Sequence, residues 1–331
     1  MTGSTIETLD DGRGGHVHFV QTDHVNWVLL QDDSGVTLID GGYPKQADAV
    51  EDSFREVGAS PSDVRAALVT HAHVDHIGGL RLLAERHGFP VHADAVEVGH
   101  VRRDFLQQAG PADLAPLVWR PRVARWLVEV SRLGVLDRSG IDAAQPFPAA
   151  GDLELPGRPR PVACPGHTSG HSTYLVAGGH VLVSGDALIT GHGTSSVHGP
   201  QCLPKAFHHD LATNRASVQA LAALDVDVVL PGHGPRVPRT DRGGGGDGAR
   251  VGLTRRTGKR GGLPWHGRHC PGEPGGTLPT PQHRRSPPAR GAQPSGRHRR
   301  TACTSRLHTG RPRRIRGPRR VPRRGLQPRR V

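Results

Sequence analysis

Residues 66–79 read AALVTHAHVDHIGG and contain four potential metal ligands within six positions. The first four residues are apolar, as in a buried strand that ends at Thr70, and the two glycines at the end precede a segment with helical spacing. The polar residues between them therefore occupy a strand-to-helix turn. His71 and His73 alternate and therefore project together from the strand end. Asp75 and His76 turn the other way at the start of the helix. Imidazole and carboxylate groups so arranged suit Zn²⁺ and similar divalent ions, although a cluster alone could be a coincidence in a His-rich chain.

Three further positions carry ligand-type side chains directly after strand-like runs. His167 lies in PGHTSGH, Asp186 ends VLVSGD and His233 lies in PGHG. A glycine beside each of them allows a tight turn and the close approach of an ion. One such placement is ordinary, but several together are hard to explain as core histidines. The pattern therefore predicts a metal site.

With these residues in this order, the sequence resembles the metallo-β-lactamase superfamily. The matching residues are His71, His73, Asp75, His76, His167, Asp186 and His233. The turn IDGG at 39–42 also fits the pattern, and the resemblance covers roughly residues 15–236. It implies an α/β fold, an αββα four-layer sandwich with two mixed β-sheets and the metals at one edge of both sheets.

The resemblance also implies a role for each ligand. His71, His73 and His167 would hold a first metal, Asp75, His76 and His233 a second, and Asp186 would bridge both. Two zinc ions per chain are expected, with iron or manganese as other options. Asp40 is either an acceptor for the N–H of a ligand imidazole or a simple strand-end cap.

Two divalent ions about 3.5–4 Å apart can share a water and lower its pKa from about 15.7 towards roughly 7, which gives a bridging hydroxide at neutral pH. The hydroxide attacks an ester-type carbonyl polarised by a metal, and Asp75 is the candidate to orient it and shuttle its proton. By the resemblance, Asp186 separates this chain from true β-lactamases and groups it with glyoxalase II-like thioesterases and lactonases. We therefore expect a metal-dependent hydrolase of a thioester, lactone or other ester in a small-molecule substrate.

Two alternatives stay open. The first is a mononuclear iron sulfur dioxygenase on the same scaffold, which uses a subset of these ligand positions. The second is a nucleic-acid-processing enzyme with the basic C-terminal tail as its arm. The second is the weaker one, because residues 1–236 hold 18 Lys and Arg against 27 Asp and Glu and so carry a net charge of −9.

Composition divides the chain and excludes several classes of protein. No apolar run approaches the roughly 18 residues of a membrane span, and the first twenty residues lack the apolar region of a secretory signal. The four cysteines are widely spaced, which argues against a disulfide scaffold and favours a reducing cytoplasm. The catalytic domain is expected to span 1–236.

Strands are predicted over 16–21, 25–31, 36–40, 66–70, 91–93, 153–155, 161–164, 172–176, 180–184 and 226–230, and helices over 44–57, 77–87 and 211–224. Residues 94–145 form an inserted helical segment, whose amphipathic period from Trp119 to Val130 favours ordinary packing over a cap above a site. The loop 191–210 contains His192, His198, Lys205, His208 and His209, and a solvated polar loop explains them better than contact with an anionic substrate.

Residues 237–331 carry a net charge of +22 and lack sustained apolar periodicity, so they are expected to be disordered. Arg, Pro and Gly dominate this segment almost without Lys, which is typical of GC-rich DNA read out of frame. A frameshift in the gene or in its reading is therefore a hypothesis for the tail. Sequencing the coding DNA tests it. A reading frame whose third-position GC bias matches that of residues 1–236 would contradict it.

Overall fold

Two β-sheets form the centre of the structure, a computed structural model that describes residues 3–238 and 251–252. The first sheet has seven strands in chain order: β1 (Thr5–Asp10), β2 (His16–Gln21), β3 (Trp27–Asp32), β4 (Gly35–Ile39), β5 (Val64–Leu68), β6 (Val91–Ala93) and β7 (Gln145–Pro146). The second has five, in the order β13 (Val237–Pro238), β12 (Val228–Pro231), β10 (Val181–Gly185), β9 (Ser172–Val176) and β8 (Arg160–Ala163). The short strands β11 (Asp225–Val226) and β14 (Val251–Gly252) pair with each other.

The helices are α1 (Ala47–Glu56), α2 (Val74–His87), α3 (Val98–Val101), α4 (Pro111–Leu114), α5 (Pro121–Leu133) and α6 (Leu211–Leu221). Single 3₁₀ turns cover Pro44–Gln46, Pro61–Asp63, Ala115–Leu117, Ala177–Gly179 and Lys205–Phe207. Among the residues that the structure describes, none of the helices combines the length and hydropathy needed to cross a bilayer.

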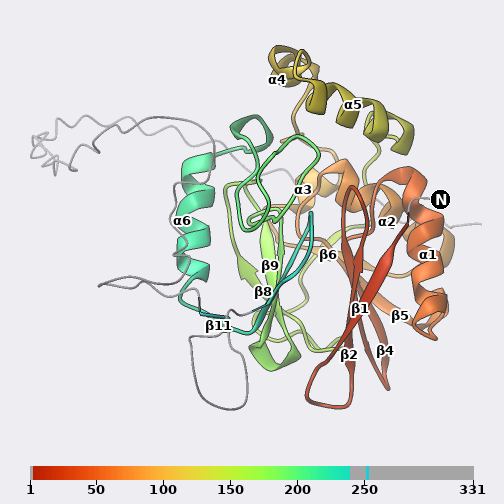
Figure 1. Cartoon of the computed structure of the whole chain (residues 1–331). Helices are drawn as coiled ribbons and strands as arrows, with labels where there is room; N and C mark the ends of the chain where they lie inside the picture. The colour runs from red at the N-terminus through yellow and green to blue at the C-terminus, as the bar shows by residue number, and fades with distance from the viewer. Residues whose placement is uncertain (1–2, 239–250, 253–331) are drawn as a thin grey trace, which may run out of the picture. The chain divides into compact units, whose positions relative to one another are not determined.

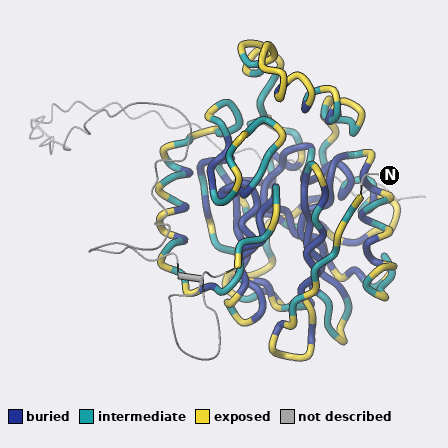
Figure 2. The backbone as a smooth tube through the Cα atoms, viewed as in Figure 1, coloured by how far each residue is buried: buried dark blue, intermediate teal, exposed yellow. Residues whose placement is uncertain are grey.

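Three of the four hydrophobic clusters among the described residues separate four layers. Alternate side chains of each strand point to opposite faces, so Phe19 of β2 and Val183 of β10 meet between the sheets, whereas Val20 points outward. The outer face of the first sheet packs against α1 and α2, and Leu182 turns to the outer face of the second sheet, beneath α6. Figure 1 shows α1 and α6 on opposite sides of the two sheets, and Figure 2 shows the buried backbone concentrated between them. The predicted αββα sandwich is confirmed.

Each sheet contains the same strand–helix–strand unit. In the first sheet α1 connects the parallel strands β4 and β5, and in the second α6 connects the parallel strands β10 and β12. In such units the carboxyl ends of the strands meet at one edge, which is where ligands usually bind. Both sheets are mixed, because β1–β4 and β8–β10 pair antiparallel.

The strand predictions missed β1, β7 and β13 and included one strand, at 153–155, that the structure does not form. Residues 5–10 form β1, although their sequence TIETLD looks polar, because a strand at the sheet edge needs few apolar side chains. Residues 153–155 are not a strand: Leu153 fills the core between the sheets from an irregular loop. The second sheet also continues past position 236, because β13 pairs with β12. Apart from 237–238 and 251–252, residues 237–331 lie outside the described part of the chain, so disorder and a frameshift remain predictions there.

The inserted segment contains α3, α4 and α5, three separate helices joined by turns. In α5, Val123, Trp126 and Val130 are buried at the predicted helical spacing, but Trp119 is 74% exposed. The predicted amphipathic helical period is therefore present only from the start of α5 onwards.

Candidate metal centre

All seven predicted ligand residues lie together at the edge where the strands of both sheets end. His71 and His73 follow β5, Asp75 and His76 open α2, His167 follows β8, Asp186 follows β10 and His233 follows β12. They form two groups, one of His71, His73, His167 and Asp186 and one of Asp75, His76 and His233, in each of which the ligand atoms lie within 4.8 Å of one another. Residues far apart in the sequence are thus brought to one place by the two parallel crossovers.

In the first cluster three imidazole nitrogens face one another. His167 Nε2 lies 3.1 Å from His71 Nε2 and 3.1 Å from His73 Nδ1. The carboxylate of Asp186 closes this group, with its Oδ2 3.6 Å from His167 Nε2. All four residues are buried.

The same carboxylate belongs to the second cluster. Asp186 Oδ1 lies 3.4 Å from His76 Nε2, and Asp186 Oδ2 lies 3.1 Å from His233 Nε2. Asp75 Oδ2 is 3.4 Å from His233 Nε2. The side chain of Asp75 is 14% exposed, whereas those of His76, His233 and Asp186 are 2% exposed or less, so Asp75 marks the open side of the centre.

The outward nitrogen of three imidazoles donates to an oxygen. His73 Nε2 donates to the carbonyl oxygen of Gln107 (2.8 Å), His76 Nδ1 donates to Asp40 Oδ2 (2.8 Å), and His233 Nδ1 donates to the carbonyl oxygen of His24. An imidazole in its neutral form carries only one N–H, so in that form, which cation binding requires, the other nitrogen of each ring presents a lone pair to the cluster.

Two relays fix the remaining rings in the same way. Thr70 Oγ1 donates to Asp40 Oδ2 (2.7 Å) and so accepts from His71 Nδ1 (3.1 Å). His208 Nε2 donates to a backbone carbonyl, which leaves His208 Nδ1 to accept from His167 Nδ1 at 3.3 Å. The inward Nε2 atoms of His71 and His167 are therefore lone-pair donors.

This donor set fits divalent cations. Lone pairs of neighbouring imidazoles repel each other at 3.1 Å unless a positive charge lies between them. His76 Nε2 and Asp186 Oδ1 are buried and lack a hydrogen-bond partner among the described residues, which a metal would supply. Nitrogen and carboxylate ligands together suit zinc-type ions. The structure places Asp40 as an acceptor for the N–H of His76, in a left-handed conformation (φ 60°).

The two clusters hold different charge before any cation binds. Burial lowers the pKa of His73 to about 4, and burial with neighbouring imidazoles lowers the pKa of His71 and His167. Burial would also lower the pKa of His233, but the carboxylates of Asp186 and Asp75 outweigh it and raise that pKa to about 10. The carboxylates of Asp186, Asp40 and Asp75 likewise raise the pKa of His76 well above its usual value. The first cluster is therefore neutral in its imidazoles at pH 7, whereas the second holds protons on His76 and His233 that a cation must displace.

Cation affinity is therefore expected to depend on pH mainly at the second cluster. Because His76 and His233 must lose protons, the apparent affinity there should rise about tenfold per pH unit between pH 6 and 8 for each proton displaced, while that of the first cluster changes little. Zinc titrations against a chelator at several pH values, with proton release measured in weak buffer, test this. Equal pH dependence of the two binding steps would contradict it.

The loop 191–210 is closer to the centre than predicted. His208 contacts His167, and the ring of His192 lies 5.0 Å from that of His233 and 5.2 Å from that of Trp126. The interpretation as a solvated loop was wrong for these two histidines, because nothing local distinguishes them from the exposed His198 and His209.

Sequence reasoning also missed Tyr43. Tyr43 is 2% exposed, and its phenol lies near enough to Asp75 and Asp186 for their charges to act on it. Burial raises the pKa of Tyr43 well above its usual value, and the charges of Asp75 and Asp186 act in the same direction. The phenol therefore stays protonated beside these carboxylates.

A small residue is required beside His233. A Cβ atom on Gly232 would lie 2.3 Å from Asp186 Oδ1 and 3.0 Å from the His76 ring. Gly232→Ala is expected to displace the shared carboxylate and weaken cation binding about tenfold, as measured by zinc competition. Gly191→Ala is the matched control, because its Cβ would meet only Gly234 Cα at an ordinary 3.6 Å. Equal affinities in both variants would argue against the close fit.

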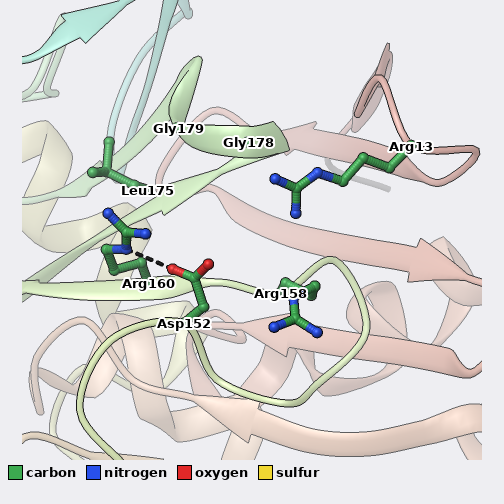
Figure 3. A pocket seen from close by; sticks show the side chains of 7 residues that line it. All are labelled: Arg13, Asp152, Arg158, Arg160, Leu175, Gly178 and Gly179. Atoms are coloured by element: carbon green, nitrogen blue, oxygen red, sulfur yellow. Dashed lines mark hydrogen bonds and ion pairs between the residues drawn. The ribbon is translucent and has the colours of Figure 1, made fainter.

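A separate hollow of about 60 Å³ lies at the opposite ends of the strands (Figure 3). It is lined by Arg13, Asp152, Arg158, Arg160, Leu175, Gly178 and Gly179. Asp152 and Arg160 form an ion pair across it at 2.5 Å. The hollow contains none of the seven predicted ligands and is not part of the metal centre.

The sandwich and this donor set define a metallohydrolase of the metallo-β-lactamase type. The family model described as Metallo-beta-lactamase superfamily matches residues 20–233, and the chain therefore belongs to that superfamily. It is 30% identical over 248 residues to the probable metallo-hydrolase YflN of Bacillus subtilis, in a match covering 71% of this chain and 88% of that protein.

Two further similarities are more limited in extent. The chain is 36% identical over 169 residues to a hydroxyacylglutathione hydrolase of Halorhodospira halophila, which covers 51% of this chain and 46% of that protein. A solved metallo-β-lactamase of Cronobacter sakazakii is 21% identical, with a TM-score of 0.48, over 69% of this chain and 78% of that one.

Proposed function

We propose that this chain is a dinuclear zinc hydrolase that cleaves a thioester, lactone or other ester bond in a small-molecule substrate. The observation that carries the proposal is the single carboxylate of Asp186, which lies 3.6 Å from a nitrogen of the first cluster and 3.1 Å from a nitrogen of the second. Similarity to a hydroxyacylglutathione hydrolase supports an acylated substrate. We also propose a cytoplasmic location, in keeping with Cys164 and Cys202, which are buried and form no disulfide with each other.

Two divalent cations would supply an acidified water and an electrophile for the substrate carbonyl. His71, His73 and His167 would hold one cation, His76, His233 and Asp75 the other, and Asp186 both. The Asp75 carboxylate, the most exposed of the group, accepts the proton of the attacking water and returns it to the leaving group. The protonated phenol of Tyr43 lies beside this carboxylate.

Metal analysis with a substrate panel tests the proposal. Purified protein is expected to contain up to two zinc-type ions per chain, and chelation should abolish turnover of a thioester, lactone and ester panel, with recovery on adding zinc. Turnover that survives complete metal removal would exclude this mechanism. One iron per chain, with oxygen consumption on a glutathione persulfide, would favour the sulfur dioxygenase alternative instead.

A further inference from the structure

A buried carboxylate outside the seven ligands contacts both loops of the first cluster. Glu97, between β6 and α3, is 0% exposed. Its Oε1 accepts from the backbone N–H of Ala72 at 2.8 Å, and its Oε2 accepts from Thr168 Oγ1 at 2.9 Å and from the backbone N–H of Gly170 at 3.0 Å. Ala72 separates two predicted ligands and Thr168 follows a third, so one side chain spans the 71–73 and 167–170 loops.

The charge of Glu97 is fully compensated by donors. His100 Nε2 accepts from the backbone N–H of Gln107 at 3.2 Å, so the proton of this buried ring is on Nδ1, which donates to Glu97 Oε1 at 2.8 Å. Four donors thus satisfy the two carboxylate oxygens, which a buried ion requires. Burial would raise the pKa of Glu97, but the donors His100, Ala72 and Thr168 outweigh it and lower that pKa.

The same network continues to a ligand ring. The carbonyl oxygen of Gln107 accepts from His73 Nε2 at 2.8 Å, and its side-chain Oε1 accepts from the backbone N–H of Ser169 at 2.9 Å. The loops are also fitted to each other, because a Cβ atom on Gly170 would lie 2.4 Å from the backbone nitrogen of Glu97. The inserted segment therefore does more than pack against the domain.

We propose that Glu97 is a positioning residue of the first cluster, whose carboxylate holds the His71–His73 loop and the His167 loop at the separation that a cation needs. The inference rests on the proposed metal-dependent function. A glutamine at this position could keep the Ala72 and His100 contacts through its oxygen, but its NH₂ would face the N–H of Gly170. The loops would then part, and the second cluster, which Glu97 does not contact, would be little affected.

Cation binding to metal-free Glu97→Gln tests this without reference to turnover. Zinc competition and the absorption spectrum of a cobalt(II) titration are expected to show affinity at the first cluster reduced about 10- to 100-fold, with less than about a threefold change at the second. Asp11→Asn is the matched control, because Asp11 is also buried and accepts from the backbone N–H groups of Arg13 and Gly15, away from all ligands. It should bind both cations as the unsubstituted chain does.

The outcomes separate the two proposals. If the unsubstituted chain takes up no cation, the proposed function fails. If it takes up two and folded Glu97→Gln binds them equally well, or Asp11→Asn weakens binding as much, only the role of Glu97 is overturned. Should Glu97→Gln fail to fold, Thr168→Val removes one donor and is expected to weaken the first cluster about threefold to tenfold, and unchanged binding in that variant would likewise overturn the inference.

Discussion

Replacing Asp186 by alanine is expected to release both cations and to lower kcat/KM at least about 10³-fold. The substitution removes a ligand from each cluster at once, together with the negative charge that lies within 3.1 Å of His233 Nε2 and 3.4 Å of His76 Nε2. A loss of about 4 kcal/mol of transition-state stabilisation corresponds to that factor. Metal content after gel filtration and kcat/KM on the best substrate of the panel provide the measurement.

Asp152→Ala is the matched control for this experiment. Asp152 pairs with an arginine in the hollow at the other end of the strands, at a partly exposed position, so its loss should leave metal content and kcat/KM unchanged. Full metal content and full activity in Asp186→Ala would show that the carboxylate does not bridge the clusters.

Asp40→Asn is expected to lower kcat/KM about 100-fold while most of the fold is kept. Asp40 accepts from the backbone N–H and the hydroxyl of Thr70 and from His76 Nδ1, at 2.7–2.8 Å. An asparagine can place its oxygen towards only one side, so its NH₂ would face His76 and favour the wrong tautomer, in which Nε2 carries the proton instead of a lone pair.

Nitrogen NMR of the His76 ring checks the tautomer directly, alongside metal content and kinetics. Thr70→Ser keeps the hydroxyl that donates to Asp40 and should behave nearly as the unsubstituted chain does. If Asp40→Asn retains both the Nδ1–H signal and full activity, the carboxylate serves only as a strand-end cap.

The ligands could be predicted from the sequence because their signal is local. His71, His73 and the following Asp75 and His76 lie within six positions, and the remaining ligands each follow an apolar run and border a glycine. Asp40 could be placed near the site but not given a role, since an aspartate at a strand end is expected both for a backbone cap and for an acceptor of an imidazole N–H. The structure distinguishes them through the contact with His76.

The supporting residues could not be predicted, because their partners are distant in the sequence. Glu97 lies in VEVGH, where nothing marks it as buried, and its contacts come from positions 72, 168 and 170. His208 resembles its neighbour His209 in sequence, yet only His208 lies against a ligand ring. Tertiary contacts of this kind override local pattern.

The position of His233 near the end of the described sheets has a consequence for biosynthesis. A ribosome makes the motif HAHVDH early, but Asp186 and then His233 emerge only after most of the domain. A nascent chain therefore exposes an incomplete chelator, able to take up ions weakly and in the wrong geometry, until β12 joins its sheet. For the proposed dinuclear centre, correct metal loading would be the final step of maturation, and a chain stalled before that strand would carry its histidines without the means to retain the pair of ions.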